Sequence, residues 1–307
     1  MNFRRIQWIF LIAFIAIDIF LLISWQQSDA TVKETSPRNA NSATTILREM
    51  RGDGITFSTL SNKEAQGYYV SGKTGLARLR TGAQNLTYQE YRFTSTEMTS
   101  TLHQTLVINP KSPQTQLNRF IKSGSNVTAG NDYVYSPELS RVAANEVVYV
   151  QVVPSGTIMA PSGQLRFRVG DKNQVIGYTQ SYVSNVEPLR EKTTTISQQK
   201  ALIWLYQYNE LPNNSRVVWS RLAYSRLLRV SDNNVYVPTW FIALRSKSTN
   251  NVVIKRVNAF TGAVMKSTDS TTAVTNGNGA VNSRVSSDNS QSPTVDQSNV
   301  DVSSVGD

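Results

Sequence analysis

The sequence contains no cysteine, and this absence excludes several kinds of site together. Disulfides, thiol nucleophiles and thiolate metal sites all require cysteine, as does the lipid attachment of a bacterial lipoprotein. Only one histidine is present, His103, so a zinc or iron site built on several imidazoles is excluded as well. We expect His103 at the surface or in a capping role, and we predict no metal and no cofactor.

Acidic residues are scarce relative to basic ones. The chain has 21 Asp and Glu against 31 Lys and Arg, which gives a net charge of +10. The carboxylates are scattered, so no pair suited to a glycosidase can be named. Asp132 and Asp232 lie in turn-like sequences but lack the ligand spacing of a calcium loop. A glycine-rich phosphate-binding loop is also missing.

Three short motifs match the signatures of penicillin-binding proteins and serine β-lactamases. Ser197–Lys200 fits S-x-x-K, Ser231–Asn233 fits S-D-N, and Lys73–Gly75 fits K-T-G. The order is wrong, because K-T-G comes last in those enzymes and first here. Each motif also has a local explanation, with Ser197 in the first turn of a helix and the other two in turns. We therefore predict no catalytic residue, and a serine hydrolase is the least favoured function.

The long apolar run near the amino terminus predicts a membrane anchor. Residues 6–25 are mostly apolar, and about twenty residues of helix match a hydrocarbon core of ~30 Å. Arg4 and Arg5 precede the run, so this end is expected in the cytoplasm and the rest of the chain outside. The alternative is a cleaved signal peptide, with residues 28–30 as a loose small-x-small cleavage site.

One carboxylate, Asp18, interrupts this run. Near the bilayer centre it costs about 2.5–3.5 kcal/mol, which the other apolar residues offset. A neutral, tolerated Asp18 in a simple anchor is one interpretation. The other is a docking face for transmembrane helices of a partner, which a single-pass chain needs if Asp18 is to be hydrogen bonded. This predicted partner-binding face consists of Leu11, Phe14, Asp18, Leu22 and Trp25.

Charge and composition separate the two ends from the middle. Residues 26–42 read as a polar tether, and residues 269–307 are poor in large apolar residues and expected to be disordered. The tail carries a net charge of −4 and residues 1–25 carry +1. Because the whole chain carries +10, residues 26–268 carry +13. Such a basic domain outside a bacterial membrane attracts anionic lipid or wall polymer, whereas nucleic acid is not expected there.

The middle of the chain mixes helix and strand signals. Residues 44–51 predict a helix ended by Gly52, and Ser112 is expected to cap a second helix that begins at Pro113. Residues 164–169 alternate apolar and polar, and 175–178 return after a turn. Thr195 is expected to cap a third helix, running to about Asn209, through a capping box with Gln198. Antiparallel strands are then predicted at residues 216–230, 236–245 and 252–260, with a turn into 263–265.

These signals predict an α+β protein with antiparallel sheets, in two extracytoplasmic lobes. The predicted organisation is a cytoplasmic end at 1–5, a transmembrane helix at 6–25, a linker at 26–42, lobes at 43–135 and 136–268, and a disordered tail at 269–307.

Several of these segments together resemble the YycI family, over residues 3–268. The segments that carry the resemblance are Arg4–Phe14, Ile19–Leu22, the capped helix with Ala201 and Tyr206, Val237–Trp240 and Val257–Gly262.

The resemblance implies a single-pass protein that pairs with a YycH-like partner. Together the two bind the sensor histidine kinase of the Yyc (Wal) two-component system of Gram-positive bacteria and so tune cell-wall metabolism. Contacts among transmembrane helices matter in that assembly. The family often has an uncharged polar residue near Asp18, so the aspartate departs from the pattern. The alternative function is a membrane-anchored module that binds anionic wall polymer or lipid.

Overall fold

The computed structural model describes residues 8, 11, 13–21, 38–141, 143, 145–230 and 233–265. Most of the predicted linker, the acidic tail and parts of the predicted transmembrane segment lie outside these ranges. Within them, no helix combines the length and the apolar character that crossing a membrane would require. The helices are α2 (Arg38–Gly52), α3 (Leu76–Ala83), α4 (Gln114–Ile121), α5 (Pro137–Ser140) and α6 (Gln198–Gln207), with 3-10 turns at Gly130–Asp132, Pro161–Gly163 and Asp171–Asn173.

Thirteen strands of the described residues form one branched sheet, in which nearly every pairing is antiparallel. The exception is a parallel contact of β7 with β12 at Ile158 and Tyr224. The main path runs β10-β2-β13-β12-β7-β6-β8-β9-β4-β3, and β1 pairs with β11 separately. The strands are β1 (Gln66–Gly67), β2 (Val70–Thr74), β3 (Gln89–Phe93), β4 (Met98–Leu102), β5 (Tyr133–Tyr135), β6 (Glu146–Val153), β7 (Gly156–Ile158), β8 (Gln164–Val169), β9 (Val175–Gln180), β10 (Val183–Pro188), β11 (Thr193–Thr194), β12 (Ser215–Val230), β13 (Asn233–Ser246), β14 (Val252–Asn258) and β15 (Val264–Met265).

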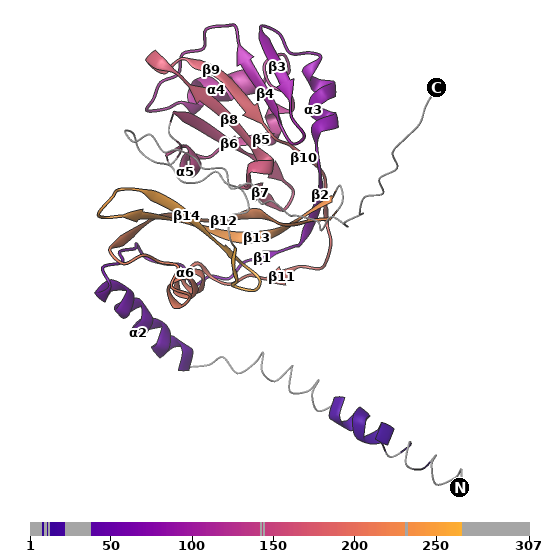
Figure 1. Cartoon of the computed structure of the whole chain (residues 1–307), viewed down its shortest axis with the longest axis vertical. Coiled ribbons are helices and arrows are strands. Elements are labelled where there is room, and N and C mark those ends of the chain that lie inside the picture. Colours follow the sequence, from indigo (N-terminus) through magenta and orange to yellow (C-terminus); the bar gives the residue numbers. More distant parts are fainter. Residues whose placement is uncertain are drawn as a thin grey trace, which may run out of the picture. The chain divides into compact units, whose positions relative to one another are not determined.

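One half of the fold packs α3 and α4 against β4, β6, β8 and β9 (Figure 1). Its core is rich in aromatic rings. The centroid of the Phe167 ring lies 5.5 Å from that of Tyr178 and 6.1 Å from that of Phe120. On α4, Leu117, Phe120 and Ile121 are buried at i, i+3, i+4 spacing, as the sequence predicts. This spacing places all three side chains on the face that meets the sheet.

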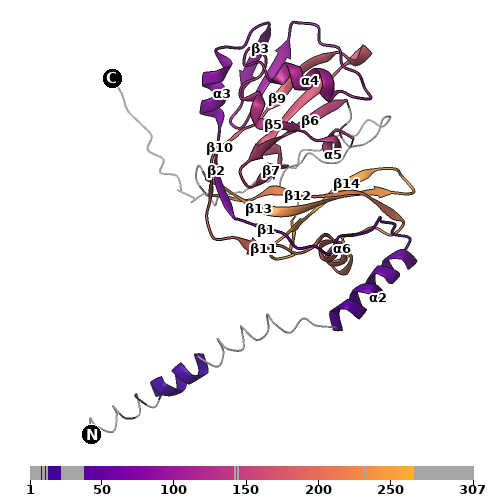
Figure 2. The ribbon, with the colours of Figure 1, turned by 180° about the vertical axis from the view of Figure 1, so that it is seen from behind.

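The other half is built on the long β12–β13 hairpin and β14. Figures 1 and 2 show these strands between α6 on one side and the β6–β9 layer on the other. Neighbouring residues of β13 therefore enter different cores: Phe241 packs with Val148 of β6, whereas Ile242 packs with Leu202 of α6. Because β13 is covered on both faces, its centre is continuously apolar rather than alternating.

Each large core draws on residues from both predicted lobes. The core around Phe167 includes Leu79 and Leu117, and the core around Leu202 includes Met50 and Ile55. The mixed α+β class and the antiparallel pairing are confirmed. The boundary at residues 135/136 stays a prediction.

Several predicted elements are confirmed in detail. Helix α2 ends at Gly52, although it begins at Arg38 rather than at Thr44. Strands β8 and β9 pair across a turn at residues 171–173, and β12 to β15 form the predicted meander.

Both predicted helix caps were wrong. Ser197, not Thr195, caps α6, with its hydroxyl accepting a hydrogen bond from the Lys200 backbone N–H at 3.2 Å. The Thr195 hydroxyl instead bonds the backbone of Ala65. For α4 the cap position is Pro113, without a side-chain cap bond, rather than Ser112. Ser and Thr close to a helix start compete for the cap, and the backbone direction decides which one reaches it.

Candidate functional site

The predicted membrane face is only partly described. Leu11, Phe14 and Asp18 belong to helical residues and are exposed, whereas Leu22 and Trp25 lie outside the described residues. A contiguous run of exposed apolar side chains is typical of a surface that contacts lipid or a partner. The docking role of this face stays a prediction.

The hydrolase-like motifs do not converge on one cleft. Lys73 and Asn233 are paired residues of β2 and β13, so K-T-G and the end of S-D-N are neighbours. Lys73 and Thr74 are therefore strand residues rather than the predicted turn. Ser197 is remote from this pair of motifs. It follows Ile196, whose carbonyl accepts a hydrogen bond from the indole N–H of Trp240. Trp240 is seven residues along β13 from Asn233, or roughly 23 Å. Ser231 and Asp232 lie outside the described residues.

His103 lies at the surface, as predicted. Its Nε2 atom is 3.6 Å from a carboxylate oxygen of Glu90, and both side chains are mostly exposed. Across the described ranges, no three His, Asp or Glu side chains are grouped closely enough to hold a metal ion.

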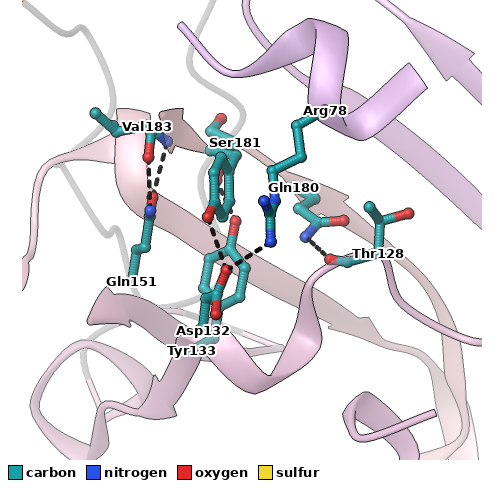
Figure 3. A network of polar contacts seen from close by, with 9 residues as sticks. Arg78, Thr128, Asp132, Tyr133, Gln151, Gln180, Ser181 and Val183 are labelled. Atoms are coloured by element: carbon teal, nitrogen blue, oxygen red, sulfur yellow. Dashed lines mark hydrogen bonds and ion pairs between the residues drawn. The ribbon is translucent and has the colours of Figure 1, made fainter. Parts of the chain in front are cut away.

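A polar network surrounds the point where the chain leaves β9 for β10 (Figure 3). The Tyr182 hydroxyl donates to Asp132 at 2.7 Å, and the Arg78 guanidinium lies 3.5 Å from the same carboxylate and 5.2 Å from the Tyr182 ring centre. Burial, and next the hydrogen bond to Asp132, raise the pKa of Tyr182 to about 12. Burial also raises the pKa of Tyr133, whose hydroxyl donates to the Ser181 carbonyl at 2.5 Å.

Two buried glutamines complete this network (Figure 3). Gln151 donates to the Val183 carbonyl at 2.7 Å and accepts from the Val183 N–H at 2.8 Å. Gln180 donates to the Thr128 carbonyl at 2.6 Å. Buried backbone groups need partners, and these amides supply them where the strand changes neighbours. The network is suited to holding β10 in place rather than to chemistry.

A groove of about 720 Å³ lies at the open end of the β12–β13 hairpin, and we call it the basic groove. Segment 56–58 forms one wall: Thr56 bonds to the backbone of Ser215 and Val217 and so extends the edge of β12. A β-bulge between Val217 and Trp219 interrupts the ladder at the same place. The groove is lined by Thr56, Phe57, Ser58, Arg216, Val217, Val218, Arg245, Ser246, Lys247 and Asn250.

Three cations and no carboxylate line the basic groove. Arg216 and Arg245 are paired residues of β12 and β13, so their side chains leave the same face of the hairpin. The Lys247 ammonium donates to the Gly54 carbonyl at 2.6 Å. This groove was not predicted from the sequence. Arg216 begins one predicted strand and Arg245 ends the next, but the register that sets the two opposite each other follows only from the structure.

The comparison with protein families decides the assignment. The sequence model of the family described as YycI protein matches residues 33–260, most of the chain. The chain belongs to the YycI family. The YycI motifs quoted above have structural reasons here: the Val257–Gly262 segment closes the turn between β14 and β15, and Trp240 bonds to the start of α6. YycI membership is consistent with a regulatory role in the Yyc/Wal system, and this family is non-catalytic.

Two solved structures show only weak likeness to this YycI protein. An uncharacterized protein from Eubacterium rectale ATCC 33656 has 10% identity and a TM-score of 0.41, and the match covers 70% of this chain and 91% of that one. The Bacillus megaterium YpeB C-terminal domain has 16% identity and a TM-score of 0.33, with 74% and 95% covered. Among curated proteins, none matches.

Proposed function

We propose that the chain is a non-enzymatic regulatory subunit of the Yyc/Wal two-component system. In this role it binds the sensor histidine kinase together with a YycH-like partner and changes the activity of the kinase. The observation that carries the proposal is the YycI family match over residues 33–260. The expected location is the cell membrane, with the amino terminus in the cytoplasm and the folded domain outside.

The physical mechanism is differential binding. A subunit that binds one state of the kinase more tightly than the other shifts the kinase toward that state. The shift is limited by the ratio of the two affinities: about 5.5 kcal/mol of difference is needed to move a population from 1:99 to 99:1. The proposal therefore requires contacts that exist in only one kinase state.

The proposed docking face is the helix surface that carries Asp18. Inside a bilayer, a hydrogen bond from Asp18 to a polar group on a partner helix contributes ~0.6–2 kcal/mol. Leu11 and Phe14, exposed in the structure, are apolar neighbours of this face. A chain with a single spanning helix has no internal partner for Asp18, which supports an intermolecular contact.

Capture of the tagged full-length chain in mild detergent, followed by mass spectrometry, tests the proposal. We expect the kinase and a YycH-like protein to be recovered. The variant Asp18→Leu should remain inserted but recover less of both, and Asp18→Asn serves as the control that keeps a hydrogen-bonding group. Full recovery with Asp18→Leu would reject the docking role of Asp18. Recovery of neither protein with the parent chain would reject the proposed function.

A further inference from the structure

The two arginines of the basic groove have no acidic partner among the described residues, whereas several other basic residues of the fold do. Arg166 pairs with Glu146 at 2.8 Å, and Lys255 pairs with Glu210 at 2.6 Å. Arg216 and Arg245 are exposed, and neither forms an ion pair with a carboxylate of the described residues. Their charges are thus available to a ligand.

The placement of the two arginines works against the fold. Like charges directly opposite each other on an antiparallel pair are destabilising. Arg216 and Arg245 are such a pair, and Lys247 adds a third positive charge to the groove. A β-bulge lies one residue away, and bulges often occur where a strand re-aims side chains near a functional site. An anion bound between the three cations would remove the repulsion.

The groove also indicates which anion fits. Arginine forks bind phosphate oxygens in pairs, and lysine binds phosphate as a point charge. Hydroxyl and amide groups of Ser58, Ser246 and Asn250 line the same groove and suit a polyol. The groove is lined by a single aromatic ring, Phe57, and the Arg51 guanidinium lies 5.1 Å from its centre, so only one ring face is left for stacking.

From these features we propose that the basic groove binds a polyol phosphodiester. Its volume of about 720 Å³ lies within the usual range of ligand sites and has room for more than one phosphodiester unit. Each unit carries a single negative charge, so consecutive units match cations spread over two strands and the turn that follows. The same chemistry occurs in a free polyol phosphate polymer and in a phosphatidylglycerol headgroup. The inference does not depend on the kinase partnership.

Calorimetric titration of the full-length chain in non-ionic detergent at 150 mM NaCl tests this inference. The probes are soluble poly(glycerol phosphate), monomeric dihexanoyl phosphatidylglycerol and poly-glutamate. The test variant is Arg216→Gln/Arg245→Gln/Lys247→Gln. A matched control, Lys111→Gln/Arg119→Gln/Lys122→Gln, removes the same charge from exposed residues on and beside α4.

We expect a phosphodiester probe to bind the parent chain, with about a tenfold or greater loss in the groove variant and less than about a twofold change in the control. Stronger binding of the polymer identifies a free polyol phosphate as the source, and stronger binding of the lipid identifies a headgroup. Equal losses in both variants would overturn the inference, because the attraction would then be diffuse. Equal binding of poly-glutamate, or no binding of either phosphodiester, would overturn it as well.

Discussion

Replacing Gly262 with alanine should destabilise the fold strongly, whereas the same change at Gly52 should not. Gly262 has a φ of +71°, a left-handed conformation that side chains other than that of glycine rarely adopt. Its N–H donates to the Asn258 carbonyl at 2.7 Å and closes the turn after β14. A Cβ atom built there would lie 0.9 Å from the Trp204 ring of α6, so the ring and the turn cannot both keep their places.

The expected magnitude follows from these two effects. A left-handed conformation costs an L-residue roughly 1–2 kcal/mol, and overpacking of a well-filled core typically costs 1–3 kcal/mol. Together they predict a loss of about 2–5 kcal/mol for Gly262→Ala. For a folded region of this size, such a loss lowers Tm by on the order of 10 °C.

Thermal unfolding followed by near-ultraviolet circular dichroism of the purified chain measures this effect. Gly52→Ala is the matched control, because Gly52 ends α2 and a Cβ there would meet nothing within 4 Å. That control should leave Tm unchanged or raise it slightly, since alanine favours helix. A Tm for Gly262→Ala within about 1 °C of the parent would refute the close packing of Trp204 on this turn.

Three further predictions concern α6 and the network around β10. Ser197→Ala removes the cap to the Lys200 N–H and should cost about 0.5–2 kcal/mol in urea unfolding, whereas Ser197→Asp should keep most of it; no loss with alanine would contradict the cap. Because the pKa of Tyr182 is raised from 10.0 to about 12, its contribution to stability is complete below pH 10 and is lost as the pH rises toward 12. Tyr182→Phe should therefore weaken the fall in urea midpoint between pH 9 and 11.5, and an unchanged fall would contradict the assignment. Gln151→Leu leaves both backbone groups of Val183 without their side-chain partners and should cost about 2–5 kcal/mol; a loss below about 1 kcal/mol would show that other groups replace them.

The β12–β15 meander could be predicted because its signals are local. Alternation, apolar runs and the Thr261–Gly262 turn all lie within the segment that they shape, and the structure follows them closely. The α4 core face was likewise readable from its helical spacing. In contrast, the three residues of β7 carry no strong signal, yet they join β12 to β6 and so connect the two halves of the fold. That connection depends on residues distant in sequence.

The candidate sites show the same limit. The cap of α6 was wrongly predicted at Thr195 because Thr195 and Ser197 are both suitable residue types for a cap. Only the tertiary contact of Thr195 with Ala65 shows that Ser197 is the capping residue. The basic groove needs the exact register of Arg216 opposite Arg245 and the arrival of segment 56–58 from the other end of the domain. Neither the register nor that arrival follows from composition, so the sequence indicated a diffuse basic surface and not a defined groove.

Autophosphorylation of the kinase in reconstituted vesicles tests the proposed regulatory function most directly. The rate is measured for the Yyc/Wal sensor kinase alone, with the full-length chain, and with the chain and its YycH-like partner together. The account predicts a change of about twofold or more when both proteins are present, and a smaller change with Asp18→Leu in place of the parent chain. An unchanged rate at saturating amounts of both proteins would contradict a regulatory role.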